Sequence, residues 1–358
     1  MEGTAIDIVV FAPLAPILGV LLFWFIKMLF IEGQKYLLEK IRPKHEAFCR
    51  FTNFLGIMFQ TVCHALGFTV TKSGISDFYI SVNYGRVAPK KEKKGIFEWV
   101  ANAFLFVGPF FIPPLTLLVC LFFLLENGFA SAAPSNMIDV NYTMGGQLII
   151  FGTNLYNFSA KFFEFLFTKL DLFHPAHLGF FILMILLGLG IRPSYLGEKK
   201  VNKVDLLYDL KNIWQLIIHK PLYVVLLFLS SYIFFYLSWF VKQGYYVTLF
   251  SIFGWSSIVS IVSIFVSYLV VGLIYFTDKM QGVKKAFVFL MIPLSYIFAR
   301  ILFVFVKTDL DLTLSLLIMI LVPILIIYLI LKPKGDKLKT RKKIKWFKGK
   351  KTEDKQDE

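Results

Sequence analysis

One histidine stands where a zinc-binding helix motif would place its second metal ligand. The run follows Gly56 and reads Gln60-Thr61-Val62-Cys63-His64. In such a motif two histidines four residues apart bind zinc on one helix face, and a glutamate beside the first acts as general base. Here Gln60 and Thr61 occupy those two positions. A lone imidazole cannot hold a catalytic zinc, which takes three protein ligands, and neither replacement can activate water. We therefore expect His64 to be a hydrogen-bonded residue between helices, and we expect no metal or other cofactor.

A second pair of histidines, His174 and His177, is spaced three residues apart and could bind a metal weakly. We expect this pair at the outer start of a span and His64 near the inner end of another. Most of the bilayer's thickness, on the order of 20 Å, would then separate them. An interfacial role for the pair is the favoured interpretation. Three scattered cysteines (Cys49, Cys63 and Cys120) lack metal-type spacing and are predicted to be buried small hydrophobes.

Polar residues inside late apolar runs are the other candidates for chemistry. Arg300 is an intramembrane charge and so a functional candidate by default. It also lies within snorkelling reach of the outer surface, where Asp309 and Asp311 could receive it. Four serines share one helix face: Ser256, Ser260, Ser263 and Ser267. Small hydroxyl residues allow close helix packing, which we favour, although a polar translocation path would look similar. Lys27, near the end of the first span, is expected to snorkel.

Composition defines the elements that must position these residues. Of 358 residues, 57% are hydrophobic and only 17% are charged, against about 25% charged in a typical soluble domain. Such a chain needs lipid as its solvent. The net charge of +15 comes from short basic blocks between apolar runs: 90–94, 199–203, 284–285 and the tail from Lys332 onward. That distribution indicates contact with anionic lipid headgroups and argues against nucleic-acid binding.

We predict an all-α polytopic membrane protein with about eight spanning helices. The predicted spans are Ile8–Ile31, Phe51–Phe68, Trp99–Leu125, Leu178–Ile191, Leu222–Val241, Tyr245–Phe276, Ala286–Val306 and Leu312–Leu331. Phe51–Phe68 is more polar than the others, so either a full crossing or a re-entrant segment fits it. Full crossings are preferred.

The basic tail orients the predicted spans, because positive charge accumulates in cytoplasmic loops. Counting back from a cytoplasmic tail places both termini inside, in a cell membrane. Three basic segments also fall inside: 277–285, 192–220 and 69–98. Three segments fall outside: 126–175, 242–244 and 307–311. The basic segment 32–50 disagrees, since this count places it outside.

Two segments between the spans carry their own patterns. Asp77–Val87 alternates strand-forming residues and predicts a short β-hairpin on the cytoplasmic side. Gln147–Leu166 has apolar residues at 151, 155, 158 and 162, which predicts an amphipathic helix lying on the outer membrane surface. Glycosylation sequons at Asn141 and Asn157 are weak support for an outside location.

Residues 50–210 together resemble the site-2 protease family of intramembrane zinc metalloproteases. The resemblance is carried by the altered motif and by four further segments: Leu66-Gly67-Phe68-Thr69-Val70, Gly85-Arg86-Val87, Gly108-Pro109-Phe110-Phe111-Ile112-Pro113 and Gly190-Ile191-Arg192-Pro193-Ser194. Some relatives carry an aspartate three residues past this last serine, where the chain has Gly197. Asp205 and Asp209 come later, on a lysine-flanked helix, and are expected to be solvated. The resemblance implies an inherited fold without zinc or hydrolysis.

These observations predict three regions: a protease-like membrane domain (1–220) with an outside loop (126–175), a four-helix membrane extension (221–331) and a basic cytoplasmic tail (332–358). The expected function is non-catalytic binding of a membrane protein partner or a lipid in the cavity of the ancestral active site. One alternative is a transporter of lipids or small molecules that uses the serine face and Arg300. Others are a membrane metalloprotease with an unrecognised zinc site and a membrane enzyme with non-zinc chemistry.

Overall fold

The computed structural model describes residues 5–125, 128, 142–191, 206–306 and 310–332, which are helical except for one two-stranded sheet and short connections. Six of the described helices are long and apolar enough to cross a membrane. They are α1 (Ala12–Ile41), α2 (Glu46–Val70), α8 (Pro221–Phe240), α9 (Tyr245–Thr277), α10 (Val283–Val306) and α11 (Asp311–Leu331). The chain is therefore an all-α, multi-pass membrane protein.

Shorter helices lie between α2 and α8. They are α3 (Ile96–Phe106), α4 (Gly108–Leu124), α5 (Met144–Glu164), α6 (Pro175–Gly190) and α7 (Leu206–His219). The axes of α3 and α4 are bent by 67° at Val107, just before Gly108-Pro109. All eight predicted apolar runs are helical. The count of eight crossings stays a prediction, because the Trp99–Leu125 run is bent and α6 has only 16 residues, about 24 Å of helix against a core of about 30 Å.

The chain forms two compact units, Met1–Tyr275 and Phe276–Glu358. The second contains α10 and α11, which pack against each other. The first contains the other helices and the hairpin. This division is based on contacts and differs from the predicted boundary after residue 220, which stays a prediction.

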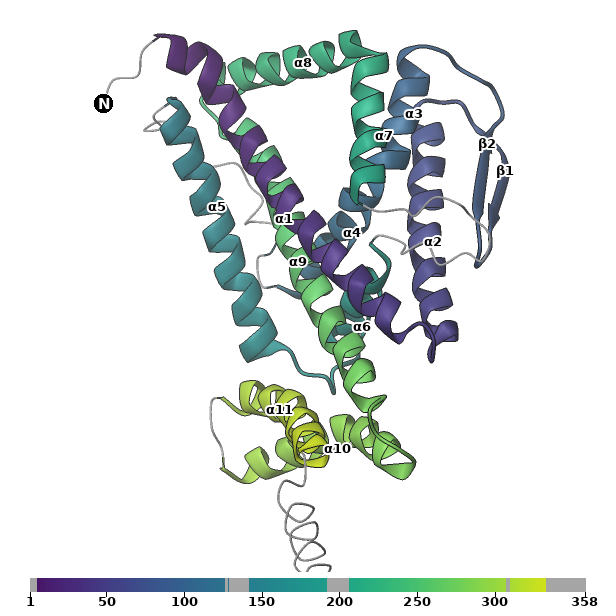
Figure 1. Ribbon diagram of the computed structural model, residues 1–358. Coiled ribbons are helices and arrows are strands. Elements are labelled where there is room, and N and C mark those ends of the chain that lie inside the picture. Colours follow the sequence, from purple (N-terminus) through teal and green to yellow (C-terminus); the bar gives the residue numbers. More distant parts are fainter. Residues whose placement is uncertain (1–4, 126–127, 129–141, 192–205, 307–309, 333–358) are drawn as a thin grey trace, which may run out of the picture. The chain divides into compact units, whose positions relative to one another are not determined.

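Three helices of the first unit, α1, α5 and α9, run side by side in the same direction (Figure 1). At one end, the Tyr246 hydroxyl of α9 donates to the Pro13 carbonyl of α1 over 2.5 Å. Toward the other end, the Lys40 ammonium of α1 lies 5.8 Å from the Tyr275 ring. Helix α5 also begins at the first end, where its Met144 amide donates to Asp7 Oδ1 over 3.1 Å.

The shared direction of α1 and α9 corrects the predicted topology. Two helices that cross one membrane in the same direction need an odd number of crossings between them, whereas four were predicted. Placing connector 242–244 opposite the N-terminus is therefore wrong. The contact of Lys40 with Tyr275 places the ends of α1 and α9 at the same end of the first unit. The membrane side of the basic segment 32–50 stays a prediction.

Helix α8 begins and ends on the same face of the first unit. Its first turn packs Tyr223 against Trp99 at the start of α3, with ring centroids 6.0 Å apart. Near its other end, the hydroxyls of Tyr232 and Tyr236 donate to the carbonyls of Val10 and Val9, in the π-helical turn (Asp7–Phe11) that precedes α1, over 2.7 and 2.6 Å. Figure 1 shows α8 running crosswise to α1 and α9. Although it is long enough to cross a membrane, α8 lies along one face of the first unit.

The apolar stripe of α5 has the predicted spacing but a different partner. Phe151, Leu155, Phe158 and Phe162 are all buried. A Cβ added at Gly19 of α1 would lie 2.4 Å from the Phe151 ring, and one at Gly254 of α9 would lie 2.5 Å from Leu155. The stripe therefore packs on two helices rather than on a lipid surface. Because α5 packs along α1, residues Met144–Glu164 are not a helix lying on the outer membrane surface as predicted, and the Asn157 sequon falls within α5.

The same-face placement of α8 predicts a labelling pattern for single cysteines in a background whose three native cysteines are replaced. Lys220→Cys and Gln243→Cys flank α8 and should react with an impermeant maleimide from the same side of sealed vesicles. Lys44→Cys, in the loop between α1 and α2, should react from the opposite side. Opposite sides for positions 220 and 243 would show that α8 crosses.

Close helix contacts through glycine predict a packing cost. A Cβ at Gly188 of α6 would meet the Ser263 carbonyl oxygen of α9 at 2.1 Å, whereas one at Gly179 on the same helix meets nothing within 4 Å. Gly188→Ala should therefore destabilise the protein by about 1–3 kcal/mol through overpacking. Unfolding in detergent micelles measures this, with Gly179→Ala as the matched control. Equal stability of the two variants would contradict close α6–α9 contact.

Candidate functional site

The predicted hairpin is present and lies against α2. Strands β1 (Ile75–Ile80) and β2 (Gly85–Pro89) pair antiparallel, with Ile80 opposite Gly85. At the turn, the Asn53 side-chain amide of α2 donates to the Val82 carbonyl over 3.0 Å. The hairpin is thus anchored to the helix that carries the altered zinc motif.

The backbone of the hairpin lies directly on Thr61, at the position of the missing general base. Thr61 is buried, and its hydroxyl donates to the Ile57 carbonyl of its own helix over 2.6 Å. A Cβ added at Gly85 would be 2.0 Å from Thr61 Oγ1. Only glycine at position 85 permits this approach without a shift of Thr61 or of the hairpin.

Gln60 and His64 lie one helical turn apart and are both half-buried. The His64 ring packs on Phe68 of the same helix, with centroids 4.4 Å apart. The hydrogen bond expected between His64 and another helix stays a prediction. In the described part of the chain, no group of three or more histidine, cysteine or acidic side chains is arranged to hold a metal.

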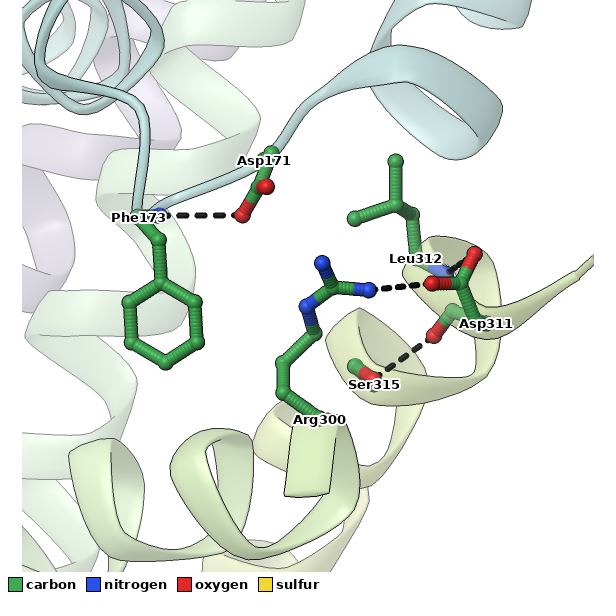
Figure 2. Close-up of polar contacts among 6 residues, drawn as sticks. All are labelled: Asp171, Phe173, Arg300, Asp311, Leu312 and Ser315. Carbon is green, nitrogen blue, oxygen red and sulfur yellow. Dashed lines mark hydrogen bonds and ion pairs between the residues drawn. The ribbon is translucent and has the colours of Figure 1, made fainter. Parts of the chain in front are cut away.

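His174 and His177 lie together at the start of α6, with ring centroids 4.6 Å apart. His177 Nδ1 accepts from the Asp171 amide over 3.2 Å, so one ring nitrogen is engaged with the backbone. Asp171 Oδ1 in turn accepts from the Phe173 amide over 3.0 Å (Figure 2). These contacts order the turn that precedes α6.

The serines of α9 are fully buried within the first unit. Ser263 donates to the Val259 carbonyl over 2.7 Å, and Ser267 accepts from the Gln34 amide of α1 over 2.5 Å. Ser263 also lies where Gly188 of α6 comes closest to α9. This placement favours helix packing over a translocation path.

Arg300 of α10 forms an ion pair with Asp311 in the first turn of α11 (Figure 2). Asp311 Oδ1 also accepts from the Leu312 amide over 2.8 Å, and the Asp311 carbonyl accepts from Ser315 over 2.6 Å. A carboxylate in the first turn of a helix is favoured by the helix dipole. Asp311 therefore is a partner of Arg300, as expected, and the pair ties the two helices of the second unit together.

The prediction that Lys27 snorkels to the membrane surface is wrong. Lys27 is fully buried, with 0% of its surface exposed. Its ammonium donates to the Phe110 carbonyl of α4 over 2.6 Å and lies 4.4 Å from the Phe111 ring. Pro114 has no N–H, so the carbonyl four residues earlier, at Phe110, loses its usual helical donor. Two features of the sequence could have predicted this contact. One is proline at position 114, which leaves a carbonyl without its donor, and the other is an isolated lysine within a span.

Several expectations lie outside the described residues. They concern Asn141, residues 192–205 with Pro193, Ser194, Gly197 and Asp205, then Asp309, and the tail from 333 onward.

Comparisons with protein-family models, curated proteins and solved structures each return no match. The resemblance to site-2 proteases therefore rests on the residues given above.

The Lys27 contact predicts a double-mutant result. Lys27→Met leaves the Phe110 carbonyl without its donor and should lower the unfolding free energy in detergent by about 1–3 kcal/mol. Pro114→Ala restores the missing helical N–H, so the same lysine substitution should cost less in that background. An equal cost in both backgrounds would show that Lys27 does not serve this carbonyl.

Proposed function

We propose that this chain is a non-catalytic, site-2-protease-like membrane protein that binds a membrane protein or lipid. The observation that carries the proposal is the contact of Gly85 with Thr61, 2.0 Å from an added Cβ to the hydroxyl. An active enzyme of this type needs a carboxylate and a water at this point. Here the hairpin backbone occupies that space, and the glutamate and first histidine are replaced.

The hairpin that covers the motif also supplies a binding surface. Phe78, Tyr79, Val82 and Tyr84 are each between 42% and 55% exposed, and the rings of Tyr79 and Tyr84 lie 5.3 Å apart. Exposed apolar patches of this kind mark sites of contact with proteins or membranes. We therefore propose that the exposed surface of the hairpin binds the partner, in place of a cavity at the altered zinc motif.

Membrane topology forms part of the proposal. With α8 on one face and α3–α4 as a bent, returning pair, seven crossings remain: α1, α2, α5, α6, α9, α10 and α11. An odd number places the two termini on opposite faces, in place of two cytoplasmic termini. We propose that the protein lies in the cell membrane and that the basic tail 332–358 contacts anionic headgroups. The maleimide labelling of positions 220, 243 and 44 tests this topology, because it shows on which side of the membrane each position lies.

The transporter alternative is not carried forward. It depended on Arg300 and on the α9 serines. Arg300 pairs with Asp311. Ser256 and Ser263 donate to carbonyls of their own helix, Ser267 accepts from Gln34, and the buried Ser260 hydroxyl has no hydrogen-bond partner among the described residues. The metalloprotease and non-zinc enzyme alternatives likewise have no supporting observation.

The proposed loss of catalysis is tested by restoring the motif. Gln60→His combined with Thr61→Glu should lower the melting temperature in detergent, because a glutamate cannot fit beneath Gly85, and should not produce stoichiometric zinc binding. Gln60→Ala, at a half-buried position, is the stability control. Metal analysis of the unmodified protein completes the test. One zinc per chain, with chelator-sensitive cleavage of a membrane peptide, would overturn the proposal.

A further inference from the structure

A polar pocket of about 310 Å³ lies between α3 and α7, at the start of α8. Its polar lining residues are Glu98, Asn102, Asn212, Gln215, His219 and Lys220. This volume is at the lower end of the range for ligand sites. The pocket is separate from the altered zinc motif on α2, and it belongs entirely to the first unit.

The two helices that form the pocket are joined by an aromatic anchor. Trp99 of α3 donates its indole N–H to the Leu216 carbonyl of α7 over 3.0 Å. Its ring also packs edge-on against Tyr223, at the start of α8. Tryptophan and tyrosine concentrate at membrane interfaces because their rings are apolar and their tips are polar. The anchor is therefore typical of a site at headgroup depth.

Helix α7 contributes polar side chains to the pocket and exposes apolar side chains beside it. Asn212, Gln215 and His219 follow one another at spacings of three and four and line the pocket, and Gln215 and His219 are themselves exposed. Trp214 and Ile218 are 61% and 54% exposed. Exposed apolar residues beside a polar pocket fit a boundary where lipid tails meet headgroups.

We propose that this pocket binds the headgroup of a zwitterionic phospholipid of the phosphatidylethanolamine type. The Glu98 carboxylate matches the lipid ammonium, and Lys220 with His219 matches the phosphate. The three amides suit the glycerol and ester oxygens. Exposed apolar residues of α8 (Leu222, Val225 and Leu229) continue from the pocket and provide a surface for the acyl chains. This inference does not depend on the proposed loss of catalysis.

Lipid binding is tested on the full-length protein, delipidated in detergent and examined by native mass spectrometry. We expect one phosphatidylethanolamine per chain, retained in preference to phosphatidylglycerol, which carries the same phosphate without the ammonium. Glu98→Gln should weaken phosphatidylethanolamine binding about tenfold and remove the preference, because it removes a charge-assisted contact. Lys220→Met should weaken both lipids. Lys211→Met, on the same helix but outside the pocket lining, is the matched control.

Three results would overturn the inference: no preference between the two lipids in the unmodified protein, an equal loss in Lys211→Met, or soluble glycerophosphoethanolamine binding as tightly as the lipid. This last result would identify a free phosphodiester as the ligand. A variant that folds but whose pocket is filled by a larger apolar side chain tests the location of the binding site. Asn102→Leu fills the site without changing a charge and should reduce binding of both lipids while the melting temperature stays near that of the unmodified protein.

Discussion

Pairing of polar groups within an apolar medium is the constraint on which this structure depends. Lipid offers no hydrogen bonds, so an unpaired carbonyl or hydroxyl at membrane depth is costly. Lys27 supplies the donor that Pro114 withdraws from Phe110, and Gln34 bonds to Ser267 across two helices. Each bond joins α1 to a neighbouring helix, to α4 in the first case and to α9 in the second.

Close contact between helices is the second constraint, and small residues make it possible. Helices in lipid gain little free energy from burying apolar surface against one another, so their association depends on close van der Waals contact. Gly67 lies on Ala101 and Phe104, Gly188 on Ser263, and Gly33 on the Tyr268 hydroxyl. Each contact would bring an added Cβ within about 3 Å of a neighbouring helix. The same kind of contact places Gly85 of the hairpin on Thr61 of α2.

Much of this arrangement could be predicted from residue patterns. Apolar runs predicted the helices, alternation over 77–87 predicted the hairpin, and the spacing of Phe151, Leu155, Phe158 and Phe162 predicted the buried face of α5. The ion pair of Arg300 with Asp311 followed from its distance to the end of the span. Each of these predictions depends on the periodicity of residues along one segment or on residues close together in the sequence, and both can be read from one sequence.

By itself, the sequence determined that the chain lies in lipid and which segments are helical, because these follow from composition and from the pattern of apolar residues. Only the tertiary structure decided that α1, α5 and α9 run in the same direction, that α8 lies along one face, and that Lys27 is buried against α4. It also decided that α3 and α7 enclose a polar pocket. These features join residues far apart in the chain, and a hydrophobic pattern records that a face is buried without recording what buries it.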